Sequence, residues 1–217
     1  MKKNRTELVF ILDRSGSMRG LEKDTIGGYN SMLERQRTEG GECVITTVLF
    51  DNRYELLHDR IDARAVRPIT EREYTVGGST ALLDAIGATI HKIAAAQKNT
   101  ARHYRADKVM FVIITDGEEN SSRSYTTAQV RDMIQRQKSR YGWEFIFLGA
   151  NMDAVETAGR FGIGADRAVD YVPDSRGTEL NFRMMSDTVA AFRANGAVPS
   201  GCLDEIRRDM RQRGGRG

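Results

Sequence analysis

The chain has 217 residues, of which 40% are hydrophobic and 29% are charged, with a formal net charge of +3. This length suits one globular domain that buries a sizeable core without disulfides or metals to staple it. A net charge this small gives no support by itself to nucleic-acid binding.

Two cysteines, Cys43 and Cys202, lie far apart in the sequence, which predicts reduced thiols rather than a disulfide framework. The apolar run behind Met1-Lys2-Lys3 ends at Asp13, so it is too short for the core of a signal peptide. No apolar run approaches the length of a membrane span. Together these features predict a cytoplasmic protein.

In the first half of the chain, apolar runs alternate with helical stretches. Residues 8–12 predict a strand buried on both faces, which ends in a turn. A helix is expected over about residues 20–37, followed by a strand over 44–50 that is rich in β-branched residues. Residues 53–61 are more polar, which suits an antiparallel edge strand.

The second half continues the alternation. Gly77-Gly78-Ser79-Thr80 opens a helix in which the apolar residues from 82 to 93 fall at helical spacing. Residues 109–114 predict the most strongly buried strand. After it we expect helices over about 126–140, 153–160 and 179–194, and strands over 143–148 and 167–172.

Strands that alternate with helices predict an α/β fold: a doubly wound, mostly parallel sheet with one antiparallel edge strand and helices on both faces. We expect this domain over residues 1–196 and a basic, flexible tail over 197–217. A disordered solubilising end is the preferred interpretation of the tail, although its arginines leave contact with nucleic acid or an acidic partner as an alternative. In such sheets, ligands bind beyond the carboxyl ends of the strands.

Three oxygen-bearing residues follow the first predicted strand: Asp13, Ser15 and Ser17. Alternate residues of an extended loop project to the same side, so one carboxylate and two hydroxyls can converge. These are hard donors, which suit Mg²⁺, Mn²⁺ or Ca²⁺ and argue against Zn²⁺ or copper. Taken alone, the pattern is more often a turn or a helix cap.

Two further loops change that balance. Thr80 precedes the second helix and Asp116 follows the strand over 109–114. Taken alone, Thr80 is better interpreted as a helix cap and Asp116 as part of an Asp-Gly turn. However, all three loops are predicted at the same edge of one sheet. The sequence therefore predicts a metal site formed by Asp13, Ser15, Ser17, Thr80 and Asp116.

The same three segments resemble the metal loops of von Willebrand factor A (vWA) domains. These segments are Asp13-Arg14-Ser15-Gly16-Ser17, Gly77-Gly78-Ser79-Thr80 and Thr115-Asp116-Gly117, each next to its strand or helix. All five positions of the family's metal-ion-dependent adhesion site (MIDAS) are filled. The chain is most similar to the compact stand-alone members of bacteria or phages.

The resemblance implies that Ser15, Ser17 and sometimes Thr80 ligate the metal directly, while Asp13 and Asp116 act directly or through water. A cation that is held mostly by neutral hydroxyls keeps much of its positive charge. A Glu or Asp side chain of a protein partner can therefore complete its coordination. We therefore expect a metal-dependent protein-interaction module, with Mg²⁺ as the cofactor and Mn²⁺ or Ca²⁺ as alternatives. No membrane partner is expected.

Glu118 and Glu119 follow Asp116 and are interpreted as a solvated acidic turn, with an added negative potential for the cation as the alternative.

Two other functions stay open. A phosphatase of the haloacid dehalogenase type also has an aspartate after its first strand, but it needs a second acid two residues later, where this chain has Ser15. Because no nucleotide-binding loop and no Ser-His-Asp or Cys-His candidate is present, we expect no enzyme. A scaffold with a purely structural metal is the remaining alternative.

Overall fold

The computed structural model describes residues 5–213 of the chain. The strands are β1 (Arg5–Asp13), β2 (Glu42–Phe50), β3 (Tyr54–Asp62), β4 (Lys108–Thr115), β5 (Glu144–Gly149) and β6 (Ala168–Asp170). The helices are α1 (Glu22–Thr38), α2 (Leu82–Asn99), α3 (Thr127–Tyr141), α4 (Ala154–Arg160), α5 (Ser175–Asn195) and α6 (Asp204–Gln212). Short 3-10 helices lie at Gly16–Met18, Arg102–Tyr104 and Ala165–Arg167.

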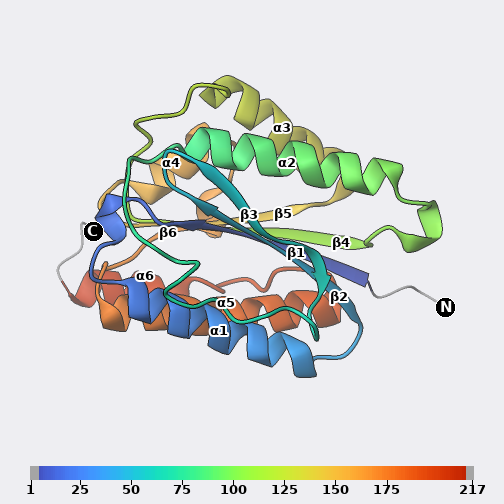
Figure 1. The fold of residues 1–217 in the computed structure, drawn as a ribbon, viewed down its shortest axis with the longest axis horizontal. Coiled ribbons are helices and arrows are strands. Elements are labelled where there is room, and N and C mark those ends of the chain that lie inside the picture. The colour runs from blue at the N-terminus through green and yellow to red at the C-terminus, as the bar shows by residue number, and fades with distance from the viewer. Residues whose placement is uncertain (1–4, 214–217) are drawn as a thin grey trace.

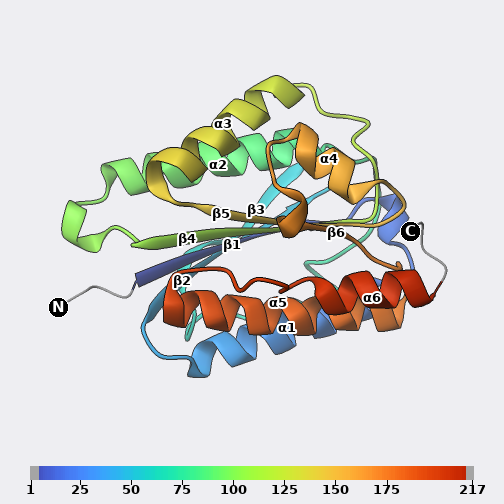
Figure 2. The ribbon, with the colours of Figure 1, turned by 180° about the vertical axis from the view of Figure 1, so that it is seen from behind.

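The strands form one sheet in the order β3-β2-β1-β4-β5-β6. Neighbouring strands are parallel, except that β2 and β3 are antiparallel. Helices α2, α3 and α4 cover one face, and α1, α5 and α6 cover the other (Figure 1; Figure 2 shows the same layers from behind). The predicted doubly wound α/β fold with an antiparallel edge strand is confirmed.

The alternation of side chains along β1 divides the core into two layers. Val9 and Ile11 belong to the apolar cluster under α2, α3 and α4, whereas Leu8 and Phe10 belong to the cluster shared with α1 and α5. All four side chains are fully buried. Since full burial of such a side chain stabilises a fold by roughly 1.5–3 kcal/mol, the central strand fixes the position of the loop that follows it.

Local signals place the helix ends. Thr126 accepts a hydrogen bond from the backbone N–H of Gln129, and the Gln129 side chain accepts one from the Thr126 N–H in return, forming a capping box. Gly142 ends α3 in the left-handed conformation, with φ of 65°. Asp174 caps α5 through the N–H of Gly177, so α5 begins several residues before the predicted position.

The C-terminal segment differs from the prediction of a flexible tail. Residues 204–212 form α6, and Cys202, Leu203 and Ile206 are buried against the rest of the domain. The interpretation as a flexible tail is wrong for residues up to 213, because apolar residues at helical spacing bury one side of this basic segment. Residues 214–217, including Arg216 of the predicted tail, lie outside the described residues, as does Met1-Lys2-Lys3.

Within residues 5–213, none of the helices is both long and apolar enough to cross a bilayer. Cys43 and Cys202 are both free and buried.

Candidate metal centre

The candidate site lies at the carboxyl ends of the two central strands. Asp13 is the last residue of β1, and Asp116 directly follows β4, the strand that pairs with β1. The chain leaves β1 toward β2 on one side, while β4 lies on the other, so the strand order reverses here. This is the position at which open α/β sheets bind ligands.

Asp13 connects the first and third loops of the site. Its Oδ1 accepts a hydrogen bond from the N–H of Ser15 at 2.6 Å. Its Oδ2 accepts one from the Thr115 hydroxyl at 2.6 Å and another from the N–H of Asp116 at 3.3 Å. One carboxylate therefore holds two loops that are far apart in the sequence in a fixed relation.

Three hydroxyls converge beside Gly117. The Oγ atoms of Ser15 and Ser17 are 3.0 Å apart. A Cβ atom added to Gly117 would lie 2.9 Å from Thr80 Oγ1, 3.0 Å from Ser17 Oγ and 3.7 Å from Ser15 Oγ. The three predicted hydroxyl ligands thus surround one small space, which a side chain at position 117 would invade.

Backbone hydrogen bonds join the first and second loops. The N–H of Gly16 donates to Gly78 O at 3.0 Å, and the N–H of Gly77 donates to Arg14 O at 2.9 Å. Gly78 has φ of +76°, and an added Cβ would lie 2.3 Å from Asn52 Oδ1, so glycine is required there. This pair of bonds positions Thr80, two residues further on.

Glu119 and Asn120 brace the second and third loops. Asn120 exchanges two hydrogen bonds with Thr80: its Oδ1 accepts from Thr80 N at 2.9 Å, and its N–H donates to Thr80 O at 3.0 Å. The Glu119 carboxylate accepts from the N–H groups of Leu83, Ser121 and Ser122. The interpretation of Glu119 as part of a solvated acidic turn is wrong, because its carboxylate satisfies backbone donors at the start of α2 and in its own loop.

The two carboxylates of the site lack a cationic partner. Asp13 and Asp116 are 1% and 2% exposed, yet within residues 5–213 neither forms an ion pair with a Lys, Arg or His. Burial raises the pKa of Asp13 in spite of its hydrogen bonds. Burial, and then the charge of Asp13, raise the pKa of Asp116 to about 7. Such a pair of acids is stabilised by a proton or by an external cation.

The arginine nearest in sequence does not supply this charge. The Arg14 side chain is buried and forms ion pairs with Asp51 at 3.4 Å and with Glu55 at 2.6 Å. Its charge is therefore compensated by acids in the turn between β2 and β3 and at the start of β3.

Asn151 is a site residue that the sequence did not reveal. It follows β5 in the left-handed region, with φ of 55°, and its Nδ2 donates to Asp116 Oδ1. Asparagine tolerates this conformation better than most residues. The only sequence signal is its position just beyond a buried strand, which is shared by many loop residues.

The donor set fits a hard divalent cation. It consists of two carboxylates and three hydroxyls, all oxygen donors. Across the described part of the chain, no group of three or more His, Cys, Asp or Glu residues is arranged to hold a metal. The structure thus brings Asp13, Ser15, Ser17, Thr80 and Asp116 to one sheet edge, without the soft or nitrogen ligands typical of a zinc or copper site.

No protein-family model matches the sequence, and no curated protein is significantly similar to it. Solved structures share the fold. A von Willebrand factor type A protein from Catenulispora acidiphila superposes with a TM-score of 0.60 at 17% identity, covering 87% of this chain and 43% of that one. The D319A mutant of the PilB minor pilin from Streptococcus sanguinis gives 0.60 at 11% identity, covering 89% of this chain and 64% of that one.

Proximal thread matrix protein 1 from the mussel byssus, in a structure with a zinc-occupied MIDAS motif, gives a TM-score of 0.57 at 13% identity over 88% of this chain and 47% of that one. The chain spans less than two thirds of the length of each of these structures. The vWA fold implied by the sequence resemblance is therefore confirmed. At these identities the likeness extends to the fold alone.

Proposed function

We propose that this protein is a metal-dependent interaction module, which binds an Asp or Glu side chain of a partner protein through a divalent cation held by Asp13, Ser15, Ser17, Thr80 and Asp116. The observation on which this rests is the convergence of three neutral hydroxyls beside two buried carboxylates that lack a cationic partner. The zinc-occupied MIDAS of a protein with the same fold supports the choice of a divalent cation.

Each residue has a distinct part in this proposal. Ser15, Ser17 and Thr80 would ligate directly through neutral oxygens, while Asp13 and Asp116 would ligate directly or through water. Asp13 also fixes the loops, since its oxygens accept from Ser15, Thr115 and Asp116. When bound, the cation supplies an incompletely neutralised positive centre for an outside carboxylate.

We propose Mg²⁺ as the physiological cation, because hydroxyl and carboxylate oxygens with retained waters match its preference. Isothermal titration with Mg²⁺ alone should show binding at one site per chain. Ser15→Ala should weaken it by at least about tenfold, as expected for the loss of a ligand. Ser139→Ala, on the exposed side of α3, is the matched control. Equal binding by both variants would disprove the site.

Partner binding is tested by capture of proteins on the immobilised chain in Mg²⁺ and in EDTA. A specific partner should bind in Mg²⁺, be released by EDTA and fail to bind the Ser15→Ala variant. Replacement of the partner's contacting Asp or Glu by Asn or Gln should abolish capture. Capture that persists in EDTA by a folded protein would leave the cation with a structural role only.

We propose no catalytic activity for this site. Ser15 stands where a phosphatase of the haloacid dehalogenase type needs a second acid. Turnover of a generic phosphate ester that requires Mg²⁺ and is abolished by Asp13→Asn would overturn this proposal.

A further inference from the structure

A groove with an apolar floor lies between α2 and α3, on the face of the sheet opposite α1 and α5. Its volume is about 630 Å³, which is in the range of small-molecule sites. None of the five candidate metal ligands lines it. Apolar and aromatic side chains form much of its wall: Ile90, Ala94, Val109, Tyr125, Met133 and Trp143.

Aromatic side chains that are packed against the rest of the domain line this groove. Trp143 is 6% exposed and stacks on Phe111, with ring centroids 5.5 Å apart. At the other end, Tyr125 packs over Gly87, where an added Cβ would lie 2.5 Å from the Tyr125 ring. The groove is thus a consequence of how α2 and α3 are spaced over the sheet, with an aromatic side chain at each end.

One polar atom of the lining lacks a partner. Gln137 of α3 is 7% exposed, and its Oε1 has no hydrogen-bond partner among the described residues. A buried acceptor left in this state destabilises the folded chain. Since this atom has almost no accessible surface, a ligand in the groove would not contact it while the side chains keep these positions.

Three cations of the lining lack an acidic partner. Lys98, Arg105 and Arg136 all line the groove, and within residues 5–213 none of them forms an ion pair. Arg105 instead donates to the carbonyl oxygens of Thr100 and Lys98 at the end of α2. The acidic residue of the lining, Asp107, accepts a hydrogen bond from the N–H of Arg5.

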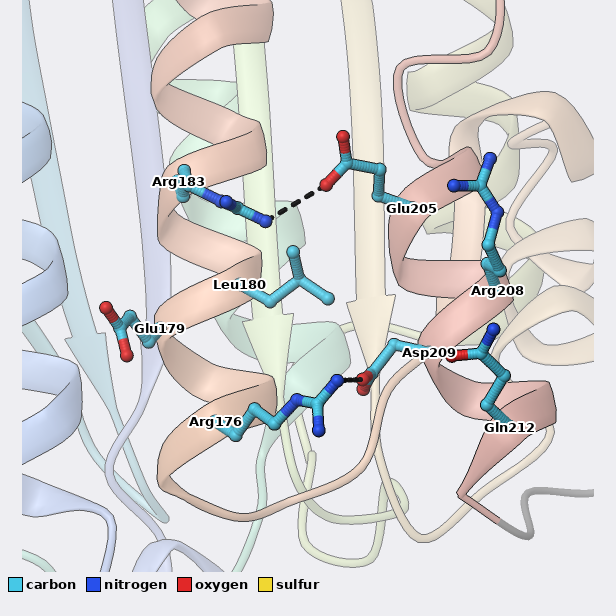
Figure 3. A pocket seen from close by; sticks show the side chains of 8 residues that line it. All are labelled: Arg176, Glu179, Leu180, Arg183, Glu205, Arg208, Asp209 and Gln212. Atoms are coloured by element: carbon cyan, nitrogen blue, oxygen red, sulfur yellow. Dashed lines mark hydrogen bonds and ion pairs between the residues drawn. The ribbon is translucent and has the colours of Figure 1, made fainter.

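A second pocket, between α5 and α6, shows the opposite arrangement. It has a volume of about 350 Å³, and it is lined by three arginines and three acids, with two of the arginines in ion pairs (Figure 3). Arg183 pairs with Glu205 at 3.0 Å, and Arg176 pairs with Asp209 at 3.2 Å. The α2–α3 groove differs because its lining has three Lys or Arg residues and one acid, which leaves an excess of positive charge beside an apolar floor.

We propose that the α2–α3 groove binds an amphipathic organic anion, whose aryl or short acyl body lies on Trp143 and Met133 and whose acidic group is bound by Lys98, Arg105 and Arg136. This site is independent of the cation and of the proposed partner.

The test uses the full chain and the fluorescent probe 8-anilinonaphthalene-1-sulfonate, an aryl anion. We expect saturable binding of one probe per folded chain, in Mg²⁺ and in EDTA alike. Octanoate should displace the probe at a concentration several-fold lower than 1-octanol, although octanol is the more apolar molecule. Absence of saturable binding, or equal displacement by octanol, would overturn the proposal.

Two variants locate the binding site. Ala94→Phe should fill the groove and weaken probe binding at least about tenfold. Arg136→Ala, at an exposed position, should weaken displacement by octanoate about two- to fivefold and leave that by octanol unchanged. Arg131→Ala, on the same helix outside the groove, is the control and should behave as the parent chain.

Retention of probe binding by a folded Ala94→Phe protein, with an unchanged far-ultraviolet dichroism spectrum, would exclude the groove as the site. If that variant does not fold, Arg136→Ala decides: an effect no larger than that of Arg131→Ala overturns the assignment.

Discussion

Two pairs of aspartates in this molecule differ in how their negative charges are compensated. Asp174 and Asp209, where α5 meets α6, share Arg213, whose guanidinium lies 2.5 Å from each carboxylate. Asp13 and Asp116, at the carboxyl edge of the sheet, share hydroxyls and backbone N–H groups but form no ion pair within the described residues. The first pair receives its counter-charge from the chain itself, whereas the second depends on protons or an external cation.

The ionisation of the two regions follows this difference. Burial alone would raise the pKa of Asp174, but the hydrogen bond from Gly177 and the charge of Arg213 outweigh it and hold that pKa below its ordinary value. Burial and the Asp13 charge raise the pKa of Asp116 to about 7. A buried carboxylate is therefore informative about function when the chain offers it no cation.

The largest expected effect is on cation affinity. Asp116→Asn keeps the shape of the side chain and removes one of the two charges, so Mg²⁺ affinity should fall by about 100-fold, the upper end for disturbed metal shells. Isothermal titration measures it, with Asp132→Asn on the exposed side of α3 as the control. An unchanged Mg²⁺ affinity would show that Asp116 does not help to hold the cation. The proposed difference between the two aspartate pairs would then be wrong.

Removal of the Arg213 side chain should destabilise the region where α5 meets α6. Arg213→Ala leaves Asp209, which is 6% exposed, without its closest partner, and we expect a loss of about 2 kcal/mol in the free energy of unfolding. Urea titration measures it, and Arg211→Ala on the exposed side of α6 is the control. Mg²⁺ should stabilise this variant and the parent chain to the same extent, because a ligand of the folded state stabilises any chain that keeps its site. A gain from Mg²⁺ that is larger for the variant would contradict the contrast.

A smaller effect is expected from Gly117→Ala. The added methyl group would lie 2.9 Å from Thr80 Oγ1 and 3.0 Å from Ser17 Oγ, so the hydroxyls must separate. Mg²⁺ affinity should fall by about tenfold while the melting temperature in EDTA changes little. Gly159→Ala, where an added Cβ meets nothing within 4 Å, is the control.

A pH dependence of stability is also expected when divalent cations are absent. In EDTA, folded Asp116, with a pKa of about 7, retains a proton that the unfolded chain, with a pKa near 3.8, has released. Stability should therefore fall as pH rises from about 4 to 7 and level off above that, because the folded state binds more protons there.

Melting temperatures at pH 5 and pH 8 test this prediction. Mg²⁺ should raise the melting temperature more at pH 8 than at pH 5, and Asp116→Asn should flatten the slope in EDTA. A stability in EDTA that rises across this range would show that other titrating groups dominate.

The sequence predicted the fold because its strongest signals are the ones that determine topology. Buried runs such as residues 109–114 predict central strands, and the polar run at 53–61 became the antiparallel edge strand β3. α6 was missed because the arginine content of the C-terminal segment outweighed a short amphipathic pattern around Leu203 and Ile206. That pattern is complete only when the helix packs against α5.

For the candidate site, the sequence predicted which loops meet but not how they are held. The placement of Asp13, Thr80 and Asp116 at one sheet edge follows from strand order, since parallel strands end on the same side. The roles of Glu119 and Asn151 depend on three-dimensional contacts between loops, for which the sequence has no periodic signal. Whether these residues bind a cation stays a prediction.

The two backbone hydrogen bonds that join the Gly16 and Gly78 loops have a consequence for assays of this protein. Those loops are separated by α1, β2 and β3, so their contact is non-local and is present only when the tertiary structure has formed. A collapsed chain with native helices but unpaired loops would offer no complete coordination sphere. A magnesium titration would therefore count only correctly assembled molecules in a preparation, which helical dichroism alone cannot do.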